Sequence, residues 1–576
     1  MADNTIEGKQ YVLGEVFGEQ FVFRIPSYQR PYAWGKEQTE ELLDDLFHAL
    51  GMNEHTPVDQ LSPYFLGSIV LIKPAGSREA DIIDGQQRIT TLSLLFAALR
   101  HTLHDEELAA NMRDCIVQKG NKARGVKDQP RLVLRELDAA FFRDEIQSPE
   151  GLERLLSQAA ELDTEAKDHL RENVKLLVTR LTAVSEARRG QLAMFLLQRC
   201  MMVVVTTDNR ASAVRIFSVL NSRGLDLLIS DILKPELIDA VGLSGNELNE
   251  FTQNWEMLEE NLGRDAFQEF FAHVRMIYAR KRAEKELLEE FRKLVLPPDA
   301  APRMTFVTQG LFELGHAFER VQIGDYRSTD HAADETIAVA LFWLKYIDNF
   351  DWVPSAILAF QRLKQRPALL ADALTSIERL AASMMIRRCS VDARVRRFSE
   401  ALGVIGEGFT GSNGTRLELD ATERKETLDA LNGDVYKAHR NVQRLILCRL
   451  DDALSSAPPP AASKTMHRSL TVEHVLPQTV DFSVTIPGSW GAWYTPAQHE
   501  ATVNKLGNLA LLTRNKNAQA SNADFVTKKA RYFQGAGGVT QFALTVQVLA
   551  ESAWDLAVFQ KHHALRVQKL KDVWKL

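Results

Sequence analysis

Residues 471–478 read Thr-Val-Glu-His-Val-Leu-Pro-Gln, and residues 504–517 read Asn-Lys-Leu-Gly-Asn-Leu-Ala-Leu-Leu-Thr-Arg-Asn-Lys-Asn. The first segment predicts a short strand that places Glu473 beside His474. Residues 509–512 predict a second strand that returns alongside it, and a helix is expected after that strand. Two short strands and a helix predict a small α+β domain with these polar side chains at its centre.

The residue types in these two segments suit phosphodiester hydrolysis. A water molecule loses a proton as it attacks phosphorus, and His474 is a base of suitable pKa. A divalent metal neutralises the charge that develops, and Glu473 with the amide oxygen of Asn517 are the hard oxygen ligands that Mg²⁺ prefers. Asn508 is the candidate that accepts from the imidazole Nδ1–H and fixes its tautomer. A core histidine with turn-forming asparagines is the structural alternative.

These segments resemble the HNH, or His-Me finger, nucleases. The acidic-His-x-x-Pro-Gln opening and the interval from Asn508 to Asn517 are similar to the HNH domains of RNA-guided CRISPR nucleases. The resemblance implies a ββα-metal fold in which His474 is the general base, Asn508 orients it, and Glu473 and Asn517 bind one Mg²⁺ or Mn²⁺ ion. The sequence departs from the family in having Glu in place of the commoner Asp and Asn in place of the final His.

A second constellation lies near the N-terminus, in residues 25–34 and residues 83–92. A predicted strand ends at Asp84-Gly85 and a helix follows at once, so free N–H groups at the helix start face an anion. Gly85 permits close backbone approach, and Arg88 in the first turn suits bidentate contact with phosphate. Asp84 suits a metal or a ribose hydroxyl. An ordinary turn with an exposed arginine remains the alternative for these residues alone.

The order of the motifs adds a second resemblance. Pro-x-Tyr-Gln-Arg-Pro-Tyr-x-Trp precedes Phe-Leu-Gly-Ser-Ile, Asp-Gly-Gln-Gln-Arg and Phe-x₃-Asn-x₂-Gly-x₂-Leu-x₃-Asp-x₂-Lys, as in the N-terminal domain of GmrSD-type restriction proteins. That resemblance implies a ParB/sulfiredoxin-like fold that binds and hydrolyses GTP or ATP and senses modified DNA. The nucleotide-site candidates are Asp84, Gly85, Gln87 and Arg88. The candidates for DNA or nucleotide contact are Tyr28, Gln29, Arg30, Lys516 and Lys528.

The 576 residues predict several domains. We expect an NTP-binding and DNA-sensing domain over residues 1–240, a mainly helical middle over 241–454, a Pro/Ala/Ser linker over 455–464 and an HNH domain over 465–576. The last domain carries 12 Lys and Arg against 7 Asp and Glu, whereas the whole chain has a net charge of −7. A basic domain on an acidic body favours contact of that domain with a polyanion such as DNA.

Several classes of protein are excluded by what the sequence lacks. The four cysteines form no C-x-x-C pair, which argues against a zinc ribbon or a disulfide framework and suits a reducing cytoplasm. No signal peptide and no long apolar run is present, so a cytoplasmic protein without membrane contact is expected. No Gly-x₄-Gly-Lys-[Ser/Thr] loop occurs, so any NTPase activity is not of the P-loop type.

The leading hypothesis is an antiphage, modification-dependent (type IV) DNA endonuclease whose cutting depends on NTP. The alternative is an NTP-dependent DNA-binding switch of ParB type with an inactive C-terminal domain, and a nuclease that acts on RNA or as a toxin ranks last. The motifs leave open whether a modified cytosine or a phosphorothioate is sensed, which NTP binds, and whether it activates or restrains cleavage. Nicking and double-strand cutting also remain open, although one site per chain would cut a duplex most easily as a homodimer.

Overall fold

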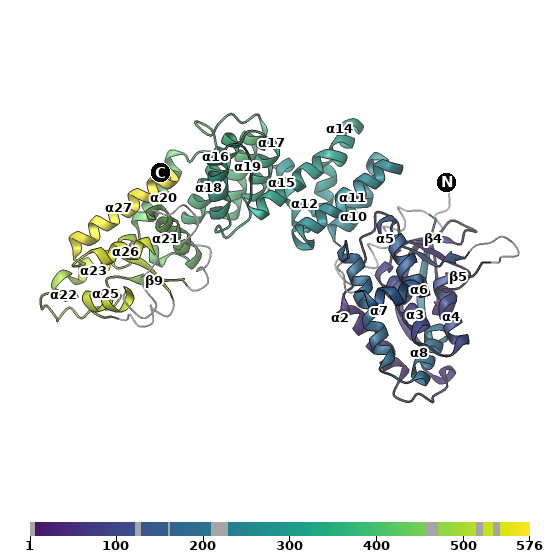
Figure 1. The fold of residues 1–576 in the computed structure, drawn as a ribbon. Helices are drawn as coiled ribbons and strands as arrows, with labels where there is room; N and C mark the ends of the chain where they lie inside the picture. Colours follow the sequence, from purple (N-terminus) through teal and green to yellow (C-terminus); the bar gives the residue numbers. More distant parts are fainter. Residues whose placement is uncertain are drawn as a thin grey trace. The chain divides into compact units, whose positions relative to one another are not determined.

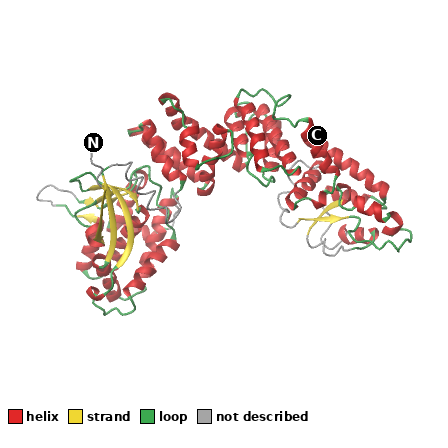
Figure 2. Ribbon diagram, turned by 180° about the vertical axis from the view of Figure 1, so that it is seen from behind, coloured by secondary structure: helices red, strands yellow, loops and turns green. Residues whose placement is uncertain are grey.

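The computed structural model describes residues 6–120, 128–158, 162–208, 228–455, 470–513, 522–533 and 542–576. The chain forms two compact units, Met1–Glu256 and Met257–Leu576, and the boundary falls inside helix α11 (Gly245–Leu262). Both units contain helices and strands (Figures 1 and 2), and helices predominate, which confirms the α+β class. Among the described helices, none combines the length and the apolar character needed to cross a membrane.

The first unit is built on a mixed six-stranded sheet with the order β1-β8-β3-β4-β2-β7. Its strands are β1 (Ile6–Val12), β2 (Val22–Arg24), β3 (Tyr64–Ile72), β4 (Glu79–Asp84), β7 (Leu132–Val133) and β8 (Cys200–Thr207). Strand β3 runs parallel to β8 and antiparallel to β4, and β4 runs parallel to β2. The apolar and β-branched runs at residues 21–25, 64–72, 80–83 and 201–207 are typical of strands, and β2, β3, β4 and β8 lie on them with small shifts at their ends.

The first unit also contains nine described α-helices that begin before α11. They are α1 (Leu13–Val16), α2 (Lys36–Leu50), α3 (Gln86–Thr102), α4 (Glu106–Ile116), α5 (Glu136–Phe141), α6 (Pro149–Ser157), α7 (Glu165–Thr182), α8 (Glu186–Gln198) and α10 (Ile229–Val241). Helix α3 packs against α4 and α7 and is buried along most of its length. Two short strands, β5 (Val117–Gln118) and β6 (Gln129–Pro130), pair separately. Helix α3 therefore brings its N-terminal residues to a fixed position at the end of β4.

The alternation of side chains along β3 explains the two faces of the sheet. Ile69 and Leu71 belong to the main core, whereas Val70 lies on the other face with Ile83. Successive residues of a strand point to opposite faces, so a β-branched run such as this one is buried on both. Tyr28 packs against that second face, which brings the first N-terminal motif to the sheet.

The second unit begins with helices and ends with a smaller α/β part. The helices before residue 455 are α12 (Arg264–Ala279), α13 (Leu287–Glu290), α14 (Ala300–Thr305), α15 (Leu311–Ile323), α16 (His331–Leu344), α17 (Val353–Leu363), α18 (Pro367–Ile386), α19 (Val391–Gly406), α20 (Ala421–Asn432) and α21 (Arg440–Leu454). Helix follows helix as the periodicity predicts. The three expected domain boundaries stay predictions, and residues 456–464 of the expected linker lie outside the described residues.

The C-terminal part contains the two predicted strands. Strand β9 (Leu470–His474) pairs antiparallel with β10 (Leu509–Thr513), with His474 opposite Leu509 and Glu473 opposite Ala510. The helices of this part are α22 (Trp490–Trp493), α23 (Pro496–Thr502), α25 (Phe525–Phe533), α26 (Ala543–Ala550) and α27 (Leu556–Trp574). The helix expected from Asn515 falls partly on residues outside the described ranges, and α25 is the described helix that follows β10.

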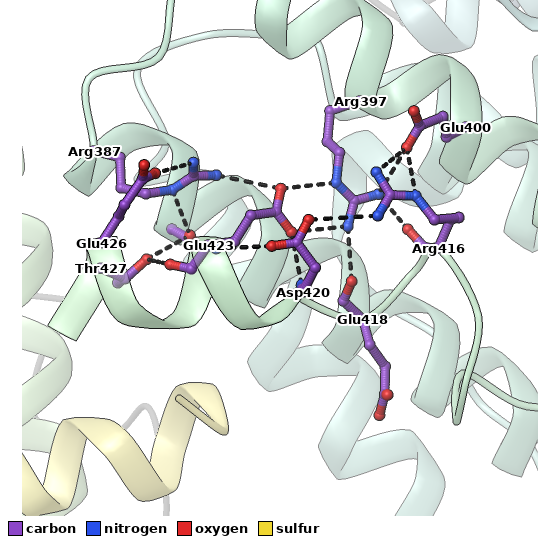
Figure 3. Close-up of polar contacts among 10 residues, drawn as sticks. Arg387, Arg397, Glu400, Arg416, Glu418, Asp420, Glu423, Glu426 and Thr427 are labelled. Carbon is purple, nitrogen blue, oxygen red and sulfur yellow. Dashed lines mark hydrogen bonds and ion pairs between the residues drawn. The ribbon is translucent and has the colours of Figure 1, made fainter.

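An ionic network fixes α20 to the helices before it (Figure 3). The Glu423 carboxylate lies between two guanidinium groups, with Arg397 Nε at 2.9 Å and Arg387 Nη2 at 3.4 Å. Glu423 also completes the cap of its own helix, because its backbone N–H donates to Asp420 at 2.8 Å. Arg387 and Arg397 come from α18 and α19. Helix α20 is thus held by charge as well as by apolar packing.

Candidate functional site

Glu473 and His474 are adjacent at the end of β9 but face different neighbours. Successive side chains alternate along a strand, and the contacts follow that rule. Glu473 meets Lys528 of α25, whereas His474 meets the ring of Tyr436, which lies in the short helical turn η6 (Val435–Lys437) after α20. The pair of strands therefore presents a carboxylate on one side and an imidazole on the other.

The imidazole of His474 is enclosed. Its ring centroid lies 4.1 Å from that of Tyr436, the side chain of Asn504 hydrogen-bonds it, and the residue is 7% exposed. Burial lowers the pKa of His474 to about 4, and the nearby Lys528 acts in the same direction while Asn504 opposes it. His474 is therefore a neutral base at physiological pH. Its Nε2 is buried and has no hydrogen-bond partner within the described part of the chain.

Asn508 is fully buried and holds the backbone just after His474. Its side-chain oxygen accepts from Leu476 N at 2.7 Å, and its amide donates to Leu476 O at 3.0 Å and to Val503 O at 2.8 Å. Its own carbonyl accepts from Val475 N at 2.9 Å. These contacts correct the expected geometry: the imidazole contact predicted for Asn508 is made by Asn504. Asn508 affects the position of His474 indirectly, because it fixes the backbone of the two residues that follow His474.

Lys528 is directed inward. Its ammonium donates to Glu473 Oε1 at 2.8 Å and to His474 O at 2.7 Å, and the residue is 3% exposed. Burial lowers the pKa of Lys528, although the Glu473 carboxylate works against that shift. The Lys528 ammonium is therefore used in contacts within the protein. The sequence predicts a DNA or nucleotide contact for it instead. The other basic candidate, Lys516, lies outside the described residues.

The donor set at Glu473 fits one end of a divalent metal site. The carboxylate is a hard oxygen ligand of the kind Mg²⁺ prefers. Its Oε1 is paired with the Lys528 ammonium at 2.8 Å, so a metal ion here would share the carboxylate with that cation. Asn517, the second expected ligand, lies outside the described residues. In the parts of the chain that the structure describes, no group of three or more His, Cys, Asp or Glu side chains gathers as a metal cluster would.

Two further residues near His474 escaped the sequence analysis. Asn504 lies in the same segment as Asn508, four positions earlier, so a test of every polar residue there would have found it. Tyr436 belongs to a distant segment without a motif, and its backbone N–H donates to Asn504 O at 3.0 Å. His499, expected on the surface, bonds Pro477 O through Nε2 at 2.8 Å and so supports the turn after β9.

The N-terminal motif is assembled around the junction of β4 and α3. Gly85 is the N-cap of α3 with φ 90°, and a Cβ there would lie 2.5 Å from Ile69 Cγ2. Burial raises the pKa of the Asp84 carboxyl, against the opposing charges of Arg88 and Arg30. Arg88 Nη1 donates to Ser68 O at 3.1 Å, so its guanidinium lies on the Gly-Ser backbone of β3. Three of the sequence motifs thus meet here.

Gln87 and Gln29 hold the first N-terminal motif in place through hydrogen bonds. Gln87 accepts from Ala33 N at 2.8 Å and donates to Pro31 O at 3.0 Å, and Gln29 donates to Ile83 O at 3.0 Å. Each fixes the segment of residues 25–34 against β4 and α3. The remaining candidate, Arg30, lines a small pocket together with Ile25, Tyr32, Gln86, Gln87, Thr90, Leu134, Arg135 and Asp138.

The fourth motif also reaches this place. Lys234 of α10 is buried and donates to Ser27 O at 3.3 Å and to Glu256 Oε1 at 3.2 Å. Glu256 in turn pairs with Arg135. The earlier part of this motif, including the predicted helix at residues 212–220 and the glycine cap after it, lies outside the described residues. The described residues therefore bring Lys234 beside the first motif.

Comparison with known families matches both ends of the chain. Residues 13–238 match the N-terminal domain of the GmrSD restriction endonucleases, and residues 421–565 match their C-terminal domain. The first match contains the Asp84–Arg88 motif, and the second contains Tyr436, His474 and Asn508. A search of curated proteins gave no match. The two family matches, in this order along one chain, show that the protein belongs to the GmrSD family of restriction endonucleases, whose substrate is DNA.

Proposed function

We propose that this restriction endonuclease, a protein of antiphage defence, cuts DNA with His474 as the general base of an HNH-type centre. The observation that carries the proposal is the position of the imidazole: His474 follows Glu473 at the end of β9, and its Nε2 has no hydrogen-bond partner among the described residues. A neutral imidazole with one ring nitrogen uncommitted is ready to take a proton from water.

In this mechanism the surrounding residues position the base. Asn504 and Tyr436 hold the ring, and Asn508 fixes the backbone of residues 475 and 476. Because Nε2 is buried, the Tyr436 ring or the chain beside it has to shift before water and DNA reach the base. His474 then removes the proton of the attacking water. The water oxygen bonds to phosphorus as the bond from phosphorus to the leaving sugar oxygen breaks, and that oxygen takes up a proton.

A divalent ion, Mg²⁺ or Mn²⁺, is proposed at Glu473 with Asn517 as a second ligand. When bound, such an ion neutralises the charge on the phosphate and on the leaving oxygen. Glu473 contributes one carboxylate oxygen from β9, and Lys528 keeps that carboxylate oriented from α25. The order β9, β10, α25 supports the HNH-type assignment, since it places a helix over the carboxylate face of the strand pair.

The N-terminal unit is proposed to bind NTP in a ParB/sulfiredoxin-like domain and to sense modified DNA, so that cutting is conditional. Support comes from the start of α3: its first N–H groups follow a glycine N-cap, and Arg88 and Arg30 supply positive charge beside Asp84. Gln87 contributes by holding the segment of residues 31–34 in place. Hydrolysis of the bound NTP is part of this proposal. The modification that the unit would sense is a modified cytosine or a phosphorothioate.

A plasmid-nicking assay tests the nuclease. Purified protein with Mg²⁺ or Mn²⁺ should nick DNA. The nicking rate is compared with and without NTP, on plain plasmid and on modified plasmid. His474→Ala should reduce the rate by about 10²-fold or more, as expected for loss of a general base, and chelation of the metal should stop cleavage. His331→Ala is the matched control because His331 is exposed on α16. Cleavage that survives in His474→Ala would exclude this base.

Nucleotide binding is tested separately with Arg88→Ala. Loss of a charge-assisted contact should weaken NTP binding by about tenfold or more, while His474-dependent cleavage of a permissive substrate stays. Unchanged NTP affinity would remove Arg88 from the phosphate site. A protein that binds NTP and DNA but never nicks under any of these conditions would instead be the NTP-dependent DNA-binding switch.

A further inference from the structure

A pocket in the helical part of the second unit lies between the two segments that the GmrSD family covers. It encloses about 580 Å³, which is within the range of ligand sites. It is lined by residues of α15, the loop after α15, the end of α17 and the start of α18. The lining residues are Glu313, His316, Ala317, Arg320, Tyr326, Arg327, Ser328, Thr329, Phe360, Gln361, Lys364, Gln365 and Pro367.

The spacing of these residues explains why they share one cavity. His316 and Arg320 are four positions apart on α15 and therefore lie on the same face of that helix. Helix α17 packs beside α15 and supplies the opposite wall. The apolar base comes from Phe360, which is buried and meets the edge of Tyr326 with ring centroids 5.9 Å apart. The cavity thus has an apolar base and a polar, charged rim.

Hydrogen bonds fix the loop that closes the pocket. Tyr326 donates its hydroxyl to Lys364 O at 2.6 Å, and Ser328 donates Oγ to Asp334 at 2.6 Å and N–H to the same carboxylate at 2.9 Å. At the loop's start, Lys345 donates to Gln322 O at 2.7 Å. These bonds tie the loop to α16, α17 and α15, so the pocket is formed in advance of any ligand.

The rim carries more positive than negative charge. Three cations, Arg320, Arg327 and Lys364, line the pocket with one carboxylate, Glu313. Glu313 accepts a hydrogen bond from Gln361 at 3.3 Å. Over the residues the structure describes, neither Arg320 nor Lys364 forms an ion pair, and Arg327 pairs with Asp325 at 3.2 Å on the outside. The whole chain is acidic, with a net charge of −7, so a cluster of cations here is not the general character of its surface.

We propose that this pocket binds the phosphate groups of a nucleotide-sized ligand, either a free nucleotide or a nucleotide unit of DNA. Arg320 offers a planar fork for phosphate oxygens, and Lys364 offers a point charge at the opposite wall. The volume exceeds what one phosphate occupies, and the apolar base with Tyr326 at its edge suits the sugar and base. The site is separate from both candidate sites described above, and it requires neither of them.

Hydrogen–deuterium exchange of the full-length protein tests the proposal, because it reports on the loop itself. The probes are a deoxynucleoside monophosphate and, separately, a short DNA duplex. Either probe should slow exchange at residues 324–330 if it occupies the pocket. The double variant Arg320→Glu/Lys364→Glu should need a ligand concentration about tenfold higher, or more, to reach the same protection. Arg396→Glu/Lys425→Glu makes the same charge change at exposed residues of α19 and α20 and should leave protection unchanged.

The two probes distinguish the source of the phosphate. Protection by the nucleotide alone identifies a free-nucleotide site, and protection by the duplex alone identifies a DNA contact. Absence of protection with both probes in the unmodified protein overturns the proposal, as does equal loss in the control variant. If the double Glu variant melts early, Arg320→Gln/Lys364→Gln replaces it, and protection that persists in that folded variant also rejects the site.

Discussion

Gly85 positions the N-terminal motif because it has no side chain. Its φ of 90° is unfavourable for other residues, and a Cβ would lie 2.5 Å from Ile69. We expect Gly85→Ala to destabilise the first unit by roughly 1–3 kcal/mol, through backbone strain and overpacking together. Thermal unfolding measures the change. Gly8→Ala is the control, since a Cβ at Gly8 would meet nothing within 4 Å, and equal melting of both variants would contradict this reading of the turn.

Asn508 and Asn504 should separate stability from catalysis. Asn508→Ala leaves three buried backbone partners unbonded, two on Leu476 and one on Val503, so a loss of about 3 kcal/mol is expected. Asn504→Ala removes a contact to the imidazole of His474 and should lower the nicking rate with little change in melting. Denaturant unfolding and nicking assays on both variants check this. Equal loss of stability in the two would mean that Asn504 is structural too.

At the same scale, the sequence predicts residue types better than partners. The Glu473-His474 pair and the residues around Asp84 belong to local sequence motifs, so the sequence indicates where both candidate sites lie. The partner of the imidazole was not, because Asn504 and Asn508 lie in one short segment and only the three-dimensional turn decides which of them reaches His474. Tyr436 lies 38 positions before His474, and no local pattern indicates a contact across that distance.

Among the elements, strands and helices with a strong local periodicity are those whose positions the sequence indicates most closely. Strand β3 and helix α2 follow from β-branched alternation and from a 3.6-residue apolar repeat. The boundary between the two units falls inside α11, where the helical pattern is continuous and gives no local signal. Likewise, the sheet order places β8 beside β3, and such long-range pairing leaves no local signal.

Helix α20 depends on the charge of Glu423. Glu423→Gln should destabilise the second unit by roughly 3 kcal/mol, because it leaves the buried Arg397 and the nearby Arg387 without their carboxylate. Denaturant unfolding measures this loss. Glu426→Gln on the same helix is the control, since Glu426 is half exposed and pairs with Arg387 alone among the described residues. Similar losses in the two variants would show that burial of the network is unimportant.

The same residue predicts a pH dependence. Burial would raise the pKa of Glu423, but the hydrogen bond and charge of Arg397 outweigh it, and the pKa lies below its ordinary value of 4.5. A lowered carboxyl pKa adds stability above the unfolded-state value and loses it as pH falls through the folded-state value. Unfolding free energies measured from neutral to acidic pH should therefore fall below pH 4.5 more steeply than in Glu423→Gln. Parallel curves would contradict the sign of the shift.

For the whole molecule, the two candidate sites lie in different units and use different chemistry. The phosphate-binding candidates belong to residues 13–238, and the proposed cutting centre belongs to residues 421–565. A signal from one to the other has to change a population of states, so the NTP or modified DNA must bind those states with different affinity. Variants in one unit are thus expected to change regulation or cutting separately, as Arg88→Ala and His474→Ala are designed to show.

One cutting centre per chain also predicts the product. The sequence contains a single Glu-His-x-x-Pro-Gln motif, and in the proposed mechanism one activated water cleaves one strand at a time. With limiting protein, supercoiled plasmid should first become open circles at a rate proportional to protein concentration, and linear DNA should follow only later. Gel analysis over time and over a range of protein concentrations measures both steps. Linear product without an open-circle intermediate, at a rate that rises with the square of concentration, would show that two chains cut together and that the active form is a dimer.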